Sequence, residues 1–246
     1  MAEHFDHIPR NPQKWTEKAP LLGKWLWVLF WMAIPHALSS LLNSDLFGPE
    51  PVFRFLYYFV PQYVFKYLGI LMQLIYFLGC GLALLKLSSA MDRYRTAGIC
   101  YLIAGAINIV FSIIPVPAVG SGLAVLVSLV SLVSGIALLI GEYHEYRGHN
   151  ELLEDVNPAL SVKWRILWKW YIGCFIALIG SIVVMFLSPV FGLMVSLTAA
   201  VVLVAVLVFK LIYLYRTAMV FRRWDPAAPL QSESGGTEGD SSDNPQ

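Results

Sequence analysis

The sequence predicts an all-α fold: a polytopic transmembrane helical bundle of six spans with both termini in the cytoplasm. Hydrophobic residues make up 58% of the chain and charged residues only 13%, whereas soluble proteins carry about 25% charged residues. Six apolar segments reach the roughly 20 residues that a helix needs to cross a bilayer. Threading these segments in and out places all seventeen Lys and Arg residues except Arg54 and Lys66 on one side. That side is therefore expected to be cytoplasmic.

The predicted spans follow one another with short connections. We expect them at residues 22–42, 63–87, 97–115, 118–140, 166–188 and 190–212. Proline removes a backbone donor and interrupts a helix, so Pro115 with Pro117, and Pro189, each divide a long apolar stretch into two spans. Residues 1–21 form a cytoplasmic segment before the transmembrane domain of residues 22–216. Residues 217–246 form a cytoplasmic tail, which is acidic and rich in Ser and Gly and is predicted to be disordered from about residue 225.

The tryptophans repeat the asymmetry of the charges. Because indole rings prefer the headgroup layer, we interpret seven of the eight as interface anchors near the cytoplasmic ends of the spans. They are Trp15, Trp25, Trp27, Trp164, Trp168, Trp170 and Trp224. The net charge of +1 indicates no nucleic-acid partner. These patterns predict an integral protein of the plasma (cytoplasmic) membrane, with the lipid bilayer as its first partner.

The six spans can be grouped into three consecutive helical hairpins. The string GLALL at residues 81–85 recurs as GIALL at residues 135–139, and YRTA at residues 94–97 recurs at residues 215–218. An ancestral duplication explains these matches, and so does shared local physics. Glycine permits close helix contact, and Tyr and Arg end a helix at the interface.

No acidic residue lies within the predicted spans, because all sixteen Asp and Glu residues fall between or outside them. An Asp at the centre of a membrane helix costs about 2.5 to 3.5 kcal/mol, and its presence there usually marks function. We therefore expect no carboxylate proton relay and no carboxylate metal site in the membrane. Glu142, Glu145 and His149 belong to a predicted cytoplasmic loop at 141–165 and are interpreted as a solvated face of a loop that could dock a cytosolic partner.

The polar residues that remain within the spans form a sparse, neutral set. Gln73 and Asn108 both reach the midplane, where they serve either as interhelical hydrogen-bonding groups or as the polar floor of a small-ligand site. His36, beside Pro35, either satisfies a carbonyl freed by the proline kink or contacts a ligand. The aromatic segment at 51–61 is expected to lie in the interface or to cover the outer mouth of the bundle. The candidate ligand-binding residues are Gln73, Asn108 and His36.

Small residues form stripes on the first and fourth spans, and such stripes let another helix approach closely. We interpret them as helix-packing residues or as the face for a membrane-protein partner or a second copy of the chain. They are Ala33, Ala37, Ser128, Ser131, Ser134 and Gly135.

Catalytic signatures are absent from the sequence. It contains no Gly-x-Ser-x-Gly elbow, no His-Glu-x-x-His pair and no phosphate-binding Gly-x-x-x-x-Gly-Lys. Isolated cysteines and scattered histidines provide no metal or haem ligand set, so we expect no cofactor and no catalytic residues. The leading hypothesis is a non-catalytic subunit or accessory component of a membrane complex. The alternatives are a binding or transport protein for a small neutral solute, and a membrane enzyme that uses loop residues.

In its six spans, its cytoplasmic termini and its Ala33/Ala37 pair, the chain is similar to the substrate-binding subunits of energy-coupling-factor vitamin transporters. This resemblance is one of architecture and covers no diagnostic stretch of sequence. It implies a bundle that binds a small solute.

Overall fold

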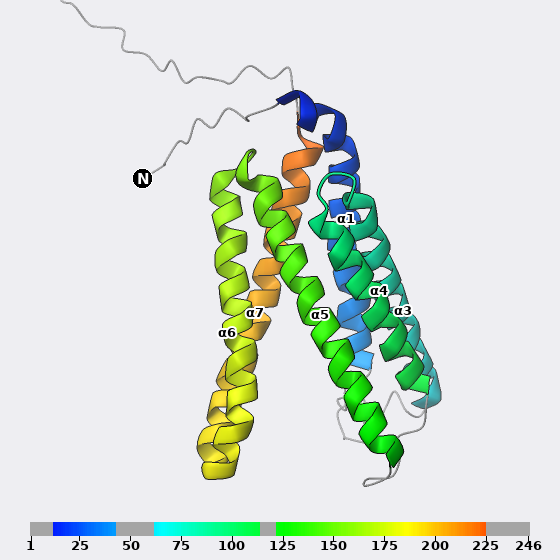
Figure 1. Cartoon of the computed structure of the whole chain (residues 1–246), viewed down its shortest axis with the longest axis vertical. Coiled ribbons are helices and arrows are strands. Elements are labelled where there is room, and N and C mark those ends of the chain that lie inside the picture. Colours follow the sequence, from blue (N-terminus) through cyan, green and yellow to red (C-terminus); the bar gives the residue numbers. More distant parts are fainter. Residues whose placement is uncertain (1–11, 43–61, 114–121, 225–246) are drawn as a thin grey trace, which may run out of the picture.

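Six long helices make up the structure, a computed structural model that describes residues 12–42, 62–113 and 122–224 (Figure 1). They are α1 (Pro12–Leu42), α3 (Gln62–Leu87), α4 (Arg93–Ile113), α5 (Gly122–Glu154), α6 (Pro158–Leu187) and α7 (Pro189–Arg222). No strand occurs in these three stretches. All six helices are long and apolar enough to cross a membrane, so the predicted all-α, six-span fold class is confirmed. The predicted aromatic loop at 51–61 and the acidic tail lie outside the described residues.

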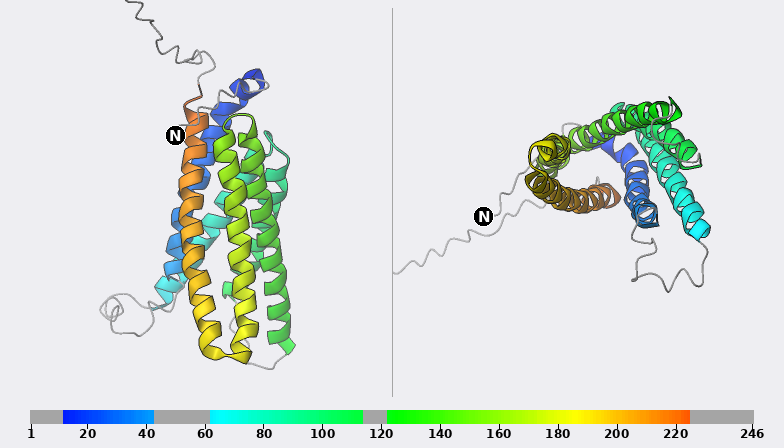
Figure 2. Two further views of the ribbon diagram at one scale, coloured as in Figure 1. Left: turned by 90° about the vertical axis from the view of Figure 1, so that its left-hand side faces the viewer. Right: turned by 90° about the horizontal axis from the view of Figure 1, so that it is seen from below.

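The helices pack as a closed ring in chain order. Each helix contacts the next one along the chain, and α7 returns to pack against α1 (Figures 1 and 2). Successive helices run in opposite directions, so α1 begins at the end of the bundle where α3 and α7 finish. Lys18, Arg93, Arg95 and Arg222 lie at that end, which we call the basic end. The ring places the inner faces of helices that are distant in sequence around one central space.

Helix α5 continues well past the predicted end of its span. It runs without interruption to Glu154, and α6 begins at Pro158 after a short turn. Asn157 caps α6, because its Oδ1 accepts a hydrogen bond from the backbone N–H of Leu160 at 3.0 Å. The proline at the first helical position has no backbone N–H and therefore needs no acceptor. Most of the predicted connection at 141–165 is therefore helical, as the ends of α5 and α6. Hydropathy detects where the apolar run ends, whereas a helix whose polar side chains find partners inside the protein does not end there.

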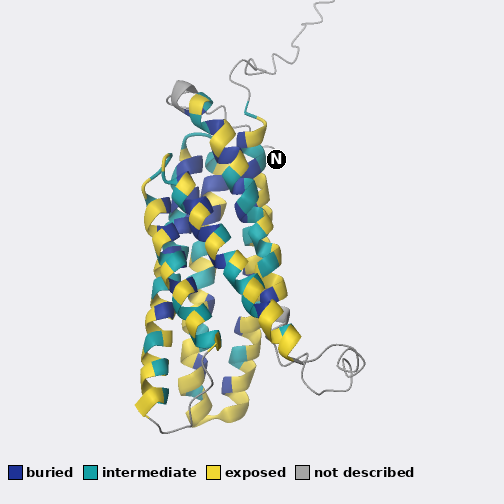
Figure 3. Ribbon diagram, turned by 90° about the vertical axis from the view of Figure 1, so that its right-hand side faces the viewer, coloured by how far each residue is buried: buried dark blue, intermediate teal, exposed yellow. Residues whose placement is uncertain are grey.

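Buried residues gather toward the basic end, and the far halves of α5, α6 and α7 are mostly exposed (Figure 3). The exposed side chains there are large and apolar, such as Leu129, Ile176 and Phe186. Such an apolar surface is suited to contact with lipid tails. Trp164 is fully buried, with 0% exposure, so its interpretation as an interface anchor is wrong. Its indole has a hydrogen-bond partner inside the bundle, which removes the cost of burying that group.

Glycines bring α3 and α4 into close contact. A Cβ added to Gly98 would lie 2.8 Å from the carbonyl oxygen of Gly81, and one added to Gly81 would lie 2.6 Å from the side chain of Leu102. Gly135, which has the position of Gly81 in the repeated string, would meet nothing within 4 Å. The two strings therefore have similar sequences but different packing roles.

Candidate functional site

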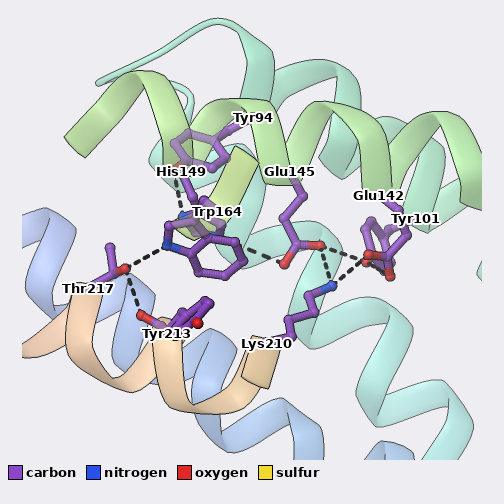
Figure 4. Close-up of polar contacts among 9 residues, drawn as sticks. All are labelled: Tyr94, Tyr101, Glu142, Glu145, His149, Trp164, Lys210, Tyr213 and Thr217. Atoms are coloured by element: carbon purple, nitrogen blue, oxygen red, sulfur yellow. Dashed lines mark hydrogen bonds and ion pairs between the residues drawn. The ribbon is translucent and has the colours of Figure 1, made fainter. Parts of the chain in front are cut away.

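Four charged or titratable side chains meet inside the ring, three from α5 and one from α7 (Figure 4). Glu142, Glu145 and His149 share one face of α5, because residues three, four and seven positions apart lie above one another on a helix. Lys210 of α7 donates to Glu142 Oε2 at 2.7 Å and to Glu145 Oε2 at 3.1 Å. The side chains of Glu142, Glu145 and Lys210, which form these two ion pairs, are only 5% to 15% exposed. We call Glu142, Glu145 and Lys210, with Tyr101, the charge cluster.

Tyr101 of α4 completes the charge cluster. Its hydroxyl oxygen lies 2.7 Å from Glu142 Oε1 and 2.7 Å from Glu145 Oε2. The ammonium group of Lys210 also lies 5.0 Å from the centre of the Tyr146 ring, a cation–π distance. Every ion of the charge cluster thus has charge-assisted or aromatic partners, as burial requires.

A second layer of aromatic residues holds His149 behind Glu145. The hydroxyl of Tyr94 lies 2.9 Å from His149 Nδ1, and the imidazole stacks on Trp164 with ring centres 4.4 Å apart. The indole N–H of Trp164 donates to Thr217 Oγ1 of α7 at 3.1 Å. His149 Nε2 lies 3.8 Å from Glu145 Oε1, too far for a hydrogen bond. This layer ties α4, α5, α6 and α7 together and fixes the orientation of His149.

The charge cluster corrects the expectation that these side chains of the predicted 141–165 connection face solvent. Glu145 is 4% exposed and His149 is 0% exposed, so the solvated face predicted for them is wrong. The signal in the sequence was the spacing of Glu142, Glu145 and His149, which puts all three on one helical face, together with a lysine late in the sixth span. Neither feature shows that the two helices meet.

A cavity of about 290 Å³ lies beside the charge cluster, and α1, α3, α4, α5 and α7 all contribute to its wall. Glu142, Glu145 and Lys210 form its charged part, and apolar side chains such as Leu29 and Leu207 form much of the rest. The cavity follows α1 from Leu29 to Ser40, a length of about 16 Å at 1.5 Å per residue. Along α7 its wall runs from Leu207 to Leu214, so Lys210 lies within the length of the cavity and not at its end.

His36, a predicted ligand-binding residue, lies in the wall of this cavity. Its ring stacks on Tyr76 of α3 with centres 4.4 Å apart. Neither side chain makes a hydrogen bond to another residue of the described part of the chain. Both are therefore polar groups that a ligand in the cavity could use.

Gln73 and Asn108 lie away from the cavity wall. Asn108 Nδ2 donates to Ser134 Oγ of α5 at 2.8 Å and to the carbonyl of Ala104 at 2.8 Å. Ser112 Oγ lies 3.4 Å from Gln73 Oε1, a long contact between α4 and α3. The structure brings these amides into interhelical contacts, which is one of the two roles predicted for them, and does not bring them together in a pocket.

The predicted packing residues fall into three environments. Ala33 and Ala37 line the cavity, and Ser134 is buried against α4. Ser128, Ser131 and Gly135 lie on the exposed face of α5. Only Ser134 thus joins two described helices. Within the described residues, no group of three or more His, Cys, Asp or Glu side chains is arranged to hold a metal ion.

In the part of the chain that the structure describes, six helices are long and apolar enough to cross a membrane, which indicates an integral membrane protein of the α-helical class. Comparison with protein-family models, with curated proteins and with solved structures found no match to the chain. The function must therefore be argued from the cavity and the charge cluster themselves.

Proposed function

We propose that the protein binds a small polar solute in the central cavity and moves it across the membrane, with no catalytic step. The single observation that carries this proposal is the placement of a charge cluster in the wall of a cavity inside the ring of apolar helices. Ionisable groups inside membrane proteins commonly mark a solute or ion pathway, because they are costly to bury. A packing role alone would not need an adjacent cavity.

The proposal includes an orientation, with the basic end in the cytoplasm, as the positive-inside rule favours. Glu142 then lies about 30 Å along α5 from its start at Gly122, close to the cytoplasmic boundary of a roughly 30 Å hydrocarbon layer. The cavity extends along α1 on both sides of that level, so a solute in it would contact the charge cluster.

The size and lining of the cavity limit the solute. A volume of about 290 Å³ is near the lower end of ligand pockets, which span about 300 to 1,000 Å³. His36 and Tyr76 offer polar contacts at the wall, and the charge cluster carries both signs. These features support a solute about as large as an amino acid, with polar or zwitterionic groups.

Cavity filling tests this proposal. The purified protein in lipid nanodiscs is heated with a panel of amino acids, amines and small carboxylates. We expect one class to raise the unfolding temperature, since a ligand at 100 times its Kd stabilises by about 2.7 kcal/mol. Ala33→Leu/Ala37→Leu fills the cavity and should abolish the shift. Ala200→Leu, on an exposed position of α7, should keep it. An equal shift in the filled and unfilled proteins would refute the proposed site.

A subunit or accessory role remains the second candidate, and a specific surface favours it. A Cβ added to Gly135 on α5, or to Gly173 or Gly180 on α6, would meet nothing within 4 Å. Small exposed residues let another membrane helix approach closely. Native mass spectrometry from membranes tests this role, and a monomer without partners would count against it.

A further inference from the structure

The hydrogen atoms of the charge cluster do not add up if both carboxyl groups are ionised. Tyr101 contacts one oxygen of Glu142 and one of Glu145, each at 2.7 Å, the usual length of a full O–H···O hydrogen bond. A phenol has one hydrogen to donate, and a carboxylate has none. Two separate hydrogen bonds of this length therefore need a second hydrogen, whereas two ionised carboxylates would have to share one.

Lys210 does not supply that hydrogen. Its ammonium group donates to Glu142 Oε2 and Glu145 Oε2 and faces the ring of Tyr146. Glu142 Oε1 has Tyr101 as its one hydrogen-bond partner within the described residues, whereas Glu145 Oε2 is approached by both Tyr101 and Lys210. The missing hydrogen thus fits on Glu142, and the negative charge fits on Glu145.

We propose that Glu142, Tyr101 and Glu145 form a proton-binding site. Glu142 Oε1–H donates to the oxygen of Tyr101, and the hydroxyl of Tyr101 donates to Glu145 Oε2. Lys210 and the Glu145 carboxylate then cancel, so the charge cluster is neutral. Two carboxylates with one ammonium and a neutral His149 would instead leave an uncompensated negative charge in a site that is mostly removed from water, and like charges that share a site favour protonation of one of them.

Further titratable groups surround the site. His36 from α1, Tyr76 and Cys80 from α3, and Lys210 from α7 line the same cavity. Lys210 is the one Lys or Arg among the described residues that line it. When the proton leaves, it passes from Glu142 Oε1 into the cavity, the bonding electron pair stays on the carboxylate, and the cluster gains one negative charge.

Only the role of the bound proton as a coupling ion rests on the proposed function. If the cavity carries a solute, the proton is the coupling ion, because its loss changes the charge that faces the solute by one unit. The site itself, as a place where a proton is held, depends on the geometry of Tyr101 and the two glutamates alone.

Infrared difference spectroscopy of the full-length protein in lipid nanodiscs tests the site without any solute. We expect wild-type protein at neutral pH to show the carbonyl stretch of a protonated carboxylic acid, shifted in D₂O. The band should vanish in Glu142→Gln. It should also vanish in Glu145→Gln, because Glu142 then ionises as the counter-ion of Lys210. The matched control is Glu154→Gln, an exposed position on the same helix, where the band should remain.

No such band in the wild-type protein would overturn the proposal, because the Tyr101 hydrogen would then be shared between two carboxylates. Persistence of the band in either cluster variant would also overturn it. If a variant does not fold, ¹³C-labelled glutamate and the variant Tyr101→Phe replace it. Tyr101→Phe removes the oxygen to which Glu142 donates, so a genuine Glu142 band must shift. An unshifted band contradicts the site. The Ala33→Leu/Ala37→Leu protein separates the two proposals, because filling the cavity should abolish solute binding and leave the band in place. Loss of solute binding with the band retained supports both proposals.

Discussion

Replacing Lys210 by methionine should destabilise the protein strongly. The change keeps most of the side-chain volume and removes the ammonium group that Glu142 and Glu145 accept from at 2.7 and 3.1 Å. All three side chains are at most 15% exposed, so solvent screens these contacts little. Removing one partner of a buried pair costs about 3 to 5 kcal/mol. At roughly 2 to 4 °C per kcal/mol for a chain of this length, the unfolding temperature should fall by about 6 to 20 °C.

Thermal unfolding of the purified protein in nanodiscs, followed by circular dichroism, measures this change. Lys163→Met is the matched control, because Lys163 is exposed on α6 and its loss should change stability by less than about 0.5 kcal/mol. The triple variant with Glu142→Gln and Glu145→Gln should recover most of the lost stability, since no buried charge then lacks a partner. Wild-type stability of Lys210→Met, or a triple variant as unstable as the single one, would contradict the buried cluster.

Two further predictions concern packing, and thermal unfolding checks both. Gly98→Ala should cost about 1 to 3 kcal/mol, because the new Cβ meets the backbone oxygen of Gly81 at 2.8 Å, whereas Gly135→Ala, with open space around it, should be neutral or stabilise by up to about 1 kcal/mol. Equal effects at both positions would argue against the close contact of α3 and α4. Trp164→Phe should cost about 1 to 3 kcal/mol, because it leaves the buried hydroxyl of Thr217 without its indole donor. The same cost in a protein that already carries Thr217→Val would show that this hydrogen bond is not the cause.

The helical fold could be predicted from local properties of the sequence. Every predicted span overlaps one helix, and the spans at 63–87 and 190–212 begin within one residue of α3 and α7. The largest difference between a predicted span and its helix is at the end of α5, which continues from residue 140 to Glu154. A hydropathy pattern ends where charged residues begin, but a helix can carry charges further when other helices supply their partners.

The candidate site could be predicted only in fragments. His36 was predicted as a ligand-binding residue, whereas Ala33 and Ala37 were predicted as helix-packing or partner-face residues, and all three line the cavity. The carboxylates were missed, since Glu142 and Glu145 follow an apolar run and look like the start of a solvated loop. Their helical spacing was visible in the sequence, but spacing on one helix does not reveal what faces it.

The sequence by itself determined how many apolar helices this protein has and which of their ends are basic. Both are local properties, because the cost of placing a residue in lipid depends on that residue and its near neighbours. Only the tertiary structure decided that Lys210 meets Glu142 and Glu145, 68 and 65 residues away, beside a cavity. That meeting depends on how each helix is rotated and tilted when α7 closes the ring against α1, and hydropathy carries no information about rotation or tilt.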